Sequence, residues 1–139
     1  MASFVKFYSF VEALAEKVHN LGSDTLKVAL TNTAPTASTD TQLSNITQIS
    51  NGNGYTTGGT AATTSSSAQT SGTYKLVLAD VTFTASGSMG PFRYVVLYND
   101  TATNDELIGY YDYGSSITLA SGETFTVDFD GSAGVLTLA

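Results

Sequence analysis

Short runs of alternating apolar residues, separated by turn residues, fill the second half of this 139-residue chain. They recur at a spacing of roughly 8–12 residues, which is typical of antiparallel sandwiches and barrels. Gly90, Asp130–Gly131 and Gly134 mark turns between them. The pattern predicts a mainly β fold, an antiparallel β-sandwich of jelly-roll-like type, with its main body in residues 74–139.

One run in this body is apolar on both faces. Phe92, Tyr94, Val96 and Tyr98 lie on one face, and Val95 and Leu97 lie on the other. Such a strand is predicted to be central and covered on both sides. Leu107–Tyr113 is predicted to pair back on it as a hairpin, and the residues from Ile117 to Phe129 to form another.

The N-terminal region has helical periodicity. Apolar residues recur at i, i+3, i+4 and i+7 at Phe4, Phe7, Tyr8, Val11, Leu14, Ala15, Val18 and Leu21. This spacing predicts an amphipathic helix over residues 3–21, begun by Ser3 and stopped by Gly22. A half-buried first strand is predicted over residues 24–31, where Leu26, Val28 and Leu30 alternate with other residues.

Residues 32–72 differ from both flanks. They are rich in Thr, Ser, Asn and Gly, with sparse apolar residues such as Ile46 and Tyr55. Forty residues without clear periodicity are long for a connection. We therefore expect an extended Ser/Thr/Gly-rich arm or loop, placed either on a neighbouring subunit or on the chain's own body, within a single domain spanning 1–139.

Charge and composition exclude several function classes. Five Lys and Arg residues stand against 12 Asp and Glu, which gives a net charge of −7. This balance disfavours binding to nucleic acid, because few cations can contact phosphates. The chain has no cysteine, which excludes disulfides, thiolate zinc sites and cysteine nucleophiles. No apolar run suits a membrane span, and the N-terminus does not resemble a secretory signal, so we expect synthesis in the cytoplasm.

Motifs that would carry catalysis or bind a cofactor or metal are weak. His19, the one histidine, falls in the last predicted helical turn, where it complements the helix dipole. Residues 52–59, GNGYTTGG, lack the strand–turn–helix context of a phosphate loop. Asp128–Gly131 resembles the start of a calcium loop, but Ala139 stands where the bidentate Glu is needed. We predict no enzyme activity, no catalytic residue, no cofactor and no metal.

Tyrosines form the remaining candidate site. Tyr94 and Tyr98 lie on one predicted strand, and Tyr110 and Tyr111 lie on the next. Exposed aromatic rings beside Asp and Asn can stack on sugars, which would make a glycan-binding surface. The alternative is a ladder of cross-strand aromatic pairs with structural roles. The ladder is favoured.

The order of several segments resembles small virion structural proteins of tailed bacteriophages. The segments are Asp24–Leu30 (DTLKVAL), Gly54–Gly59 (GYTTGG), Arg93–Tyr98 (RYVVLY) and Leu107–Tyr110 (LIGY). The resemblance covers nearly the whole chain and implies a β-rich subunit that assembles on the virus particle. It brings no active site with it.

The resemblance implies a non-enzymatic capsid cement or head-decoration protein that binds the major capsid lattice and stabilises the head. Under it we expect a virion location and a homo-oligomer, with a trimer as the candidate state. The alternative is a tail or tail-fibre component that binds host glycan through Tyr94, Tyr98, Tyr110 and Tyr111. Because aromatic residues are enriched at interfaces, the candidate partner-interface residues are Phe4, Phe7, Tyr8 and Tyr55.

Overall fold

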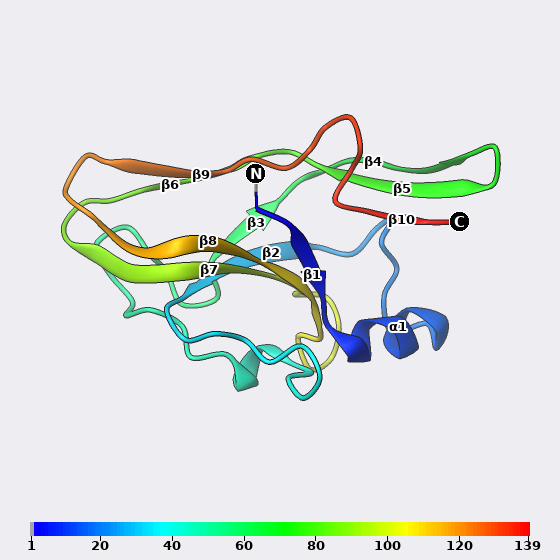
Figure 1. Cartoon of the computed structure of the whole chain (residues 1–139), viewed down its shortest axis with the longest axis horizontal. Helices are drawn as coiled ribbons and strands as arrows, with labels where there is room; N and C mark the ends of the chain where they lie inside the picture. Colours follow the sequence, from blue (N-terminus) through cyan, green and yellow to red (C-terminus); the bar gives the residue numbers. More distant parts are fainter. Residues whose placement is uncertain (1) are drawn as a thin grey trace.

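The computed structural model describes residues 2–139 and is mainly β, with 47% of residues in strands and 8% helical. Its sheets are antiparallel, and one short helix lies near the N-terminus. The predicted fold class is confirmed at this level. The strands are arranged in two layers that pack as in a sandwich (Figure 1).

The larger layer is a five-stranded sheet in the order β1-β8-β7-β2-β3. Its strands are β1 (Phe4–Lys6), β2 (Leu26–Thr31), β3 (Thr60–Ala62), β7 (Met89–Asn99) and β8 (Leu107–Leu119). β7 lies between β2 and β8 and is buried along most of its length, as expected of a central strand. β7 and β8 form the predicted hairpin across the polar turn after Asn99.

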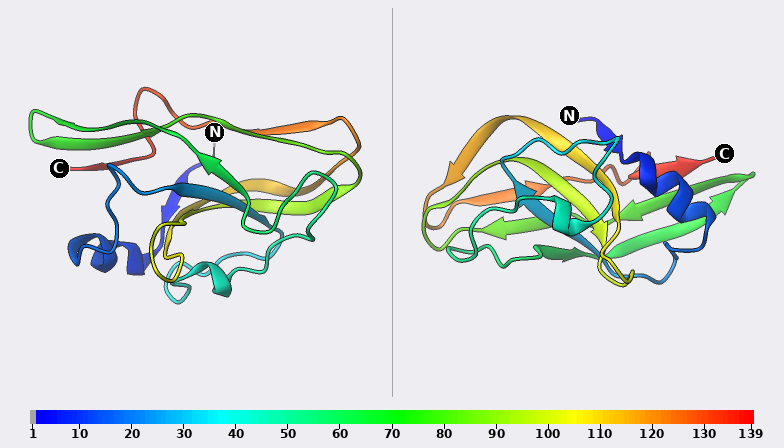
Figure 2. Two further views of the ribbon diagram at one scale, coloured as in Figure 1. Left: turned by 180° about the vertical axis from the view of Figure 1, so that it is seen from behind. Right: turned by 90° about the horizontal axis from the view of Figure 1, so that it is seen from below.

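The second layer contains two smaller sheets, β10-β5-β4 and β6-β9. Their strands are β4 (Thr64–Thr70), β5 (Thr73–Leu78), β6 (Val81–Thr84), β9 (Thr124–Val127) and β10 (Leu136–Leu138). Figure 1 and the left view of Figure 2 show them on one side of the five-stranded sheet. β9 pairs with β6 and not with β8, so the second hairpin predicted within residues 117–129 is wrong. Ile117 and Leu119 instead extend β8 along β7.

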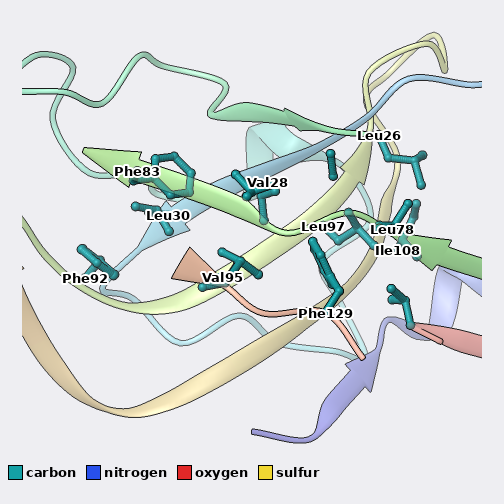
Figure 3. Close-up of a cluster of buried hydrophobic side chains, with 14 of the residues drawn as sticks. Leu26, Val28, Leu30, Leu78, Phe83, Phe92, Val95, Leu97, Ile108 and Phe129 are labelled. Carbon is teal, nitrogen blue, oxygen red and sulfur yellow. The ribbon is translucent and has the colours of Figure 1, made fainter. Parts of the chain in front are cut away.

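The main core fills the space between the layers. β2 contributes Leu26, Val28 and Leu30, which face Leu78 and Phe83 of the second layer (Figure 3). Burial of each such side chain stabilises the fold by about 1.5–3 kcal/mol relative to exposure. Strict alternation along β2 therefore fixes which face of the sheet meets the second layer.

β7 departs from strict alternation near its start. Phe92 was expected on the face of Tyr94 and Val96, but it packs in the main core with Val95 and Leu97. The register with β8 shifts between Phe92 and Tyr94, and such a bulge moves the next side chain to the opposite face.

The outer face of the five-stranded sheet is covered by segment 32–59. Ala29, Val96 and Tyr98 form a second buried cluster there with Ile46 from this segment and Phe7 from before the helix. A 3-10 helix (Leu43–Asn45) directly precedes Ile46. Residues 60–62 and 64–70 are strands paired with β2 and β5.

Segment 32–72 is therefore not an extended arm in this structure, but a covering loop followed by two strands. A few buried side chains, Ile46 and Tyr55 among them, attach the loop to the body. The Thr- and Ser-rich strand β4 is held to β5 through its backbone. Backbone pairing of this kind leaves no apolar signal in the sequence.

The N-terminal helix is much shorter than the predicted 3–21. α1 spans Tyr8–Ala15, and residues 4–6 instead form strand β1, paired with Gly109–Tyr111 of β8. The helix ends because Lys17 adopts a left-handed conformation with φ of 71°. The amide of Val18 then donates to the carbonyl of Ala13 at 2.9 Å, a helix-ending motif that glycine usually supplies.

Candidate functional site

Two of the four candidate interface residues belong to the chain's own core. Phe7 is completely buried and packs on Tyr110, with 5.4 Å between ring centroids. Tyr55 is 2% exposed and lies in the main core. Neither side chain presents a surface to a partner in this conformation, because each is buried against other residues of the same chain.

The Tyr55 hydroxyl holds the covering loop to β2. The amide of Leu30 donates to it at 3.2 Å, and it donates to Oε1 of Gln48 at 2.6 Å. The same Gln48 oxygen accepts from the amide of Gly58 at 2.7 Å. Burial raises the pKa of Tyr55 to about 12, because the phenolate would lose its hydration.

Phe4 and Tyr8 remain closer to the surface. The Phe4 ring is half-buried over Gly109 and lies 5.3 Å from the ring of Tyr111. Tyr8 is 69% exposed at the first position of α1. Of the four candidates, only Tyr8 offers a large exposed apolar surface.

The geometry of α1 explains this exposure. Phe10 points into the main core, whereas Tyr8, two positions before it, lies on the opposite side of the helix. Tyr8 and Val11, three residues apart, share the outer side, and Val11 is 52% exposed. We call the outward side chains of Tyr8 and Val11 the α1 surface. The sequence pattern assigned Val11 to the buried stripe, so Val11 was not predicted as an exposed interface residue.

The four candidate glycan-binding tyrosines do not share one surface. Tyr98 is buried, and its hydroxyl donates to the carbonyl of Gly58 at 2.6 Å. Tyr111 packs against the main core, with its ring 6.1 Å from that of Phe129. Tyr94 and Tyr110 lie edge to face, 6.3 Å apart. The structure thus brings together one pair of the four, in the manner of a cross-strand ladder.

The Tyr94 ring also contacts a charged pair. The Arg93 guanidinium lies 5.4 Å from the ring centroid and donates two hydrogen bonds to Asp112, at 2.8 and 3.0 Å. The bonds from Arg93 lower the pKa of the Asp112 carboxyl. Because both side chains are well exposed, the pair positions groups on the surface and adds little stability.

His19 lies beyond the end of α1, so its predicted role in the last helical turn is wrong. Its ring is 5% exposed and packs on Phe10, with 5.2 Å between centroids. Its Nδ1 lies 2.9 Å from Nδ2 of Asn99, a fully buried side chain at the end of β7. Burial lowers the pKa of His19, while the nearby carboxylates of Glu106 and Asp24 act in the opposite direction.

Several carboxylates have local structural roles. Asp100 lies 3.2 Å from Nζ of Lys27, and Glu123 accepts from the amide of Ala120 at 2.7 Å. Asp130 accepts from the amides of Ser132 and Ala133, which lowers its pKa and forms the β-turn expected at this position. Within residues 2–139, no three His, Asp or Glu side chains are grouped to hold a metal ion.

An apolar pocket of about 270 Å³ opens between the layers at the free side of β9. Tyr113 of β8 and Phe125 of β9 line it, with 5.5 Å between their ring centroids. Tyr113 and Phe125 lie on consecutive strands that belong to different sheets, so the pocket depends on β8 and β9 facing each other across the layers without pairing.

Comparisons with protein-family models, with curated proteins and with solved structures gave no match for this chain. In the part of the chain that the structure describes, no helix is long and apolar enough to cross a membrane.

Proposed function

We propose that this chain is a non-enzymatic structural protein of a tailed-bacteriophage virion, a capsid cement or head-decoration protein that binds the major capsid lattice. The resemblance of its ordered segments to such proteins motivates the proposal. The α1 surface is the structural observation that supports it: two large apolar side chains face solvent beside a fully formed core. Exposed aromatic and aliphatic groups of this kind are enriched at protein interfaces.

A two-layer body with few charges also suits repeated attachment. The covering loop and the paired strands leave a rigid scaffold from which α1 projects its outer side (Figure 1). Chains of net charge −7 repel one another and the packaged genome, so specific contacts have to come from apolar and hydrogen-bonding groups. The proposal includes a virion location and a homo-oligomer, with a trimer as the candidate state.

Binding to capsids tests the proposal. Purified protein is mixed with expanded, undecorated heads of its phage, and bound protein is measured after sedimentation. We expect saturable, stoichiometric binding to intact heads. Absence of binding to intact heads would overturn the head-decoration proposal.

Variants of the α1 surface locate the contact. Tyr8→Ser combined with Val11→Ser removes the apolar groups, and we expect affinity to fall by more than about tenfold, as for interface anchors. Tyr113→Ser is the matched control, because Tyr113 is also 52% exposed but lies on β8. Equal losses in both variants, or no loss in either, would contradict a contact through α1.

A further inference from the structure

A buried hydrogen-bond network joins the segment after α1 to the end of β7. Asn99 uses its whole side-chain amide in this network. Its Oδ1 accepts from the amides of Thr101 and Ala102, at 3.0 and 3.2 Å. Its Nδ2 reaches His19 Nδ1 at 2.9 Å and donates to Asp24 Oδ2 at 2.7 Å. Asp24 also accepts from the amide of Asn20, at 2.8 Å.

This network determines which ring nitrogen of His19 carries the proton. Backbone amides can only donate, so the side-chain atom of Asn99 that faces the amides of Thr101 and Ala102 must be the oxygen Oδ1. Nδ2 of Asn99 therefore faces the imidazole and must donate to it. His19 Nδ1 has to be an unprotonated acceptor, and the bonded ring is the neutral tautomer with its proton on Nε2.

Protonation of His19 is incompatible with this arrangement. A proton on Nδ1 would point at the N–H of Asn99, and Asn99 cannot turn over without losing the bonds from Thr101 and Ala102. The ring's Nε2 is buried without a hydrogen-bond partner in residues 2–139. The neutral ring already leaves its Nε2–H without an acceptor, and an imidazolium would add a second such N–H at Nδ1, which is costly in a buried site.

Charged groups near the ring come from several elements. Asp24 lies on the same segment, and Glu106 follows the β7–β8 turn; both favour a proton on His19. Lys17 lines the same surface hollow as Asp24 and Glu106. From the second layer, Tyr74 and Ser67 line a hollow beside His19, and from α1 Leu14 lines this hollow while Phe10 packs on the ring.

We propose that His19 is a proton-controlled latch that holds segment 16–25, and with it the end of α1, against the body only while the imidazole is neutral. Near the start of the segment lies Lys17, whose left-handed conformation is strained for a non-glycine residue, so contacts further along the segment have to hold it in place. Release of the latch would change the position of α1 and therefore of the α1 surface. That last consequence rests on the proposed function, whereas the latch itself does not.

The direction with pH follows from the lowered pKa of His19. The unfolded or opened segment takes up a proton near pH 6.5, while the closed state resists it. The closed state is therefore fully favoured above pH 6.5 and loses stability as pH falls below it. The opening equilibrium changes by up to about tenfold per pH unit in that window.

Hydrogen exchange of the full-length chain tests the latch. Amides of residues 18–25 are followed at about pH 7.5 and about pH 5.5, on either side of the reference histidine pKa, with correction for intrinsic exchange. We expect protection to fall by up to about tenfold at the lower pH. The control His19→Gln keeps an acceptor for Asn99 but does not titrate, so its protection should not change between the two values.

An equal loss of protection in wild type and His19→Gln, or no loss in wild type, would overturn the latch. If the variant does not fold, the wild-type imidazole is titrated by NMR. We expect a pKa below 6.5 and a shift of the Asn99 side-chain amide with the same midpoint, and a pKa at or above 6.5 would overturn the proposal. Because no phage component is present, this outcome is independent of capsid binding.

Discussion

Hydrogen bonds from single side chains help to attach the covering loop to the sheet, and the Tyr55 hydroxyl makes two hydrogen bonds there. The hydroxyl accepts from the amide of Leu30 and donates to Gln48, which in turn accepts from the amide of Gly58. Gly59 lies so close to β2 that an added Cβ would overlap the carbonyl oxygen of Val28. The loop can approach β2 this closely only where the chain has no side chain.

Removal of the Tyr55 hydroxyl tests this attachment. In Tyr55→Phe the ring still fills the core, but the buried amide of Leu30 loses its acceptor. We expect a loss of about 1–3 kcal/mol in the free energy of unfolding, measured with urea. Tyr8→Phe is the control, since Tyr8 is exposed and should change stability little. Equal stability of the two variants would contradict the role of the hydroxyl.

The raised pKa of Tyr55 also predicts that the folded chain loses stability at alkaline pH. Its pKa is about 12 in the folded chain and near 10 in the unfolded chain. The unfolded state therefore ionises first, so this stabilisation is present below about pH 10 and is lost as the pH rises toward 12. Tyr55→Phe should lose less stability than wild type between these values. If stability falls equally in Tyr55→Phe and in wild type over this pH range, the alkaline loss of stability comes from other tyrosines and the prediction for Tyr55 is contradicted.

At the scale of elements, α1 shows where sequence reasoning succeeds and fails. The periodicity correctly places a helix near the N-terminus, but residues 4–6 have the same apolar spacing and form β1. Their strand partner, Gly109–Tyr111, is a hundred residues away, and Phe4 fits only because Gly109 has no side chain. Such a long-range fit overrides local propensity and leaves no local pattern.

The helix end gives a prediction for Lys17. Glycine adopts the left-handed conformation without the cost that a Cβ brings, so Lys17→Gly should raise the free energy of unfolding by up to about 1 kcal/mol. Thermal denaturation at neutral pH measures the change. Lys17→Ala removes the same charge but keeps the Cβ and should not stabilise. A lower melting temperature for Lys17→Gly than for Lys17→Ala would contradict the strain at this residue.

At the scale of the whole molecule, regular strand spacing was enough to predict the mainly β, antiparallel fold. β2 and β7 were both found from the pattern of their apolar residues. The arrangement of the strands between layers could not be predicted, because β6 pairs with β9 across more than forty residues. The exposure of the candidate tyrosines could not be predicted for the same reason, because it depends on which segment covers each face of the sheet.

Sequence reasoning found one of the two residues of the α1 surface: Tyr8 was a candidate interface residue, and Val11 was not. Helical periodicity assigns Tyr8 and Val11 to the same buried stripe as Leu14 and Leu21. A short helix docked by Phe10 cannot bury so wide a stripe, and two large apolar side chains are left in water. These two exposed side chains link the fold to the proposed assembly on a virion.

Whether the chain is present in a phage particle, and where, tests the proposed assembly most directly. A cryo-electron microscopy map of the intact virion, into which this two-layer fold is fitted, would show both its location and its contacts. We expect copies on the head lattice, with Tyr8 and Val11 buried against the major capsid protein or a neighbouring copy. A map that places the chain on the tail, or on the head with these two side chains facing solvent, would contradict it.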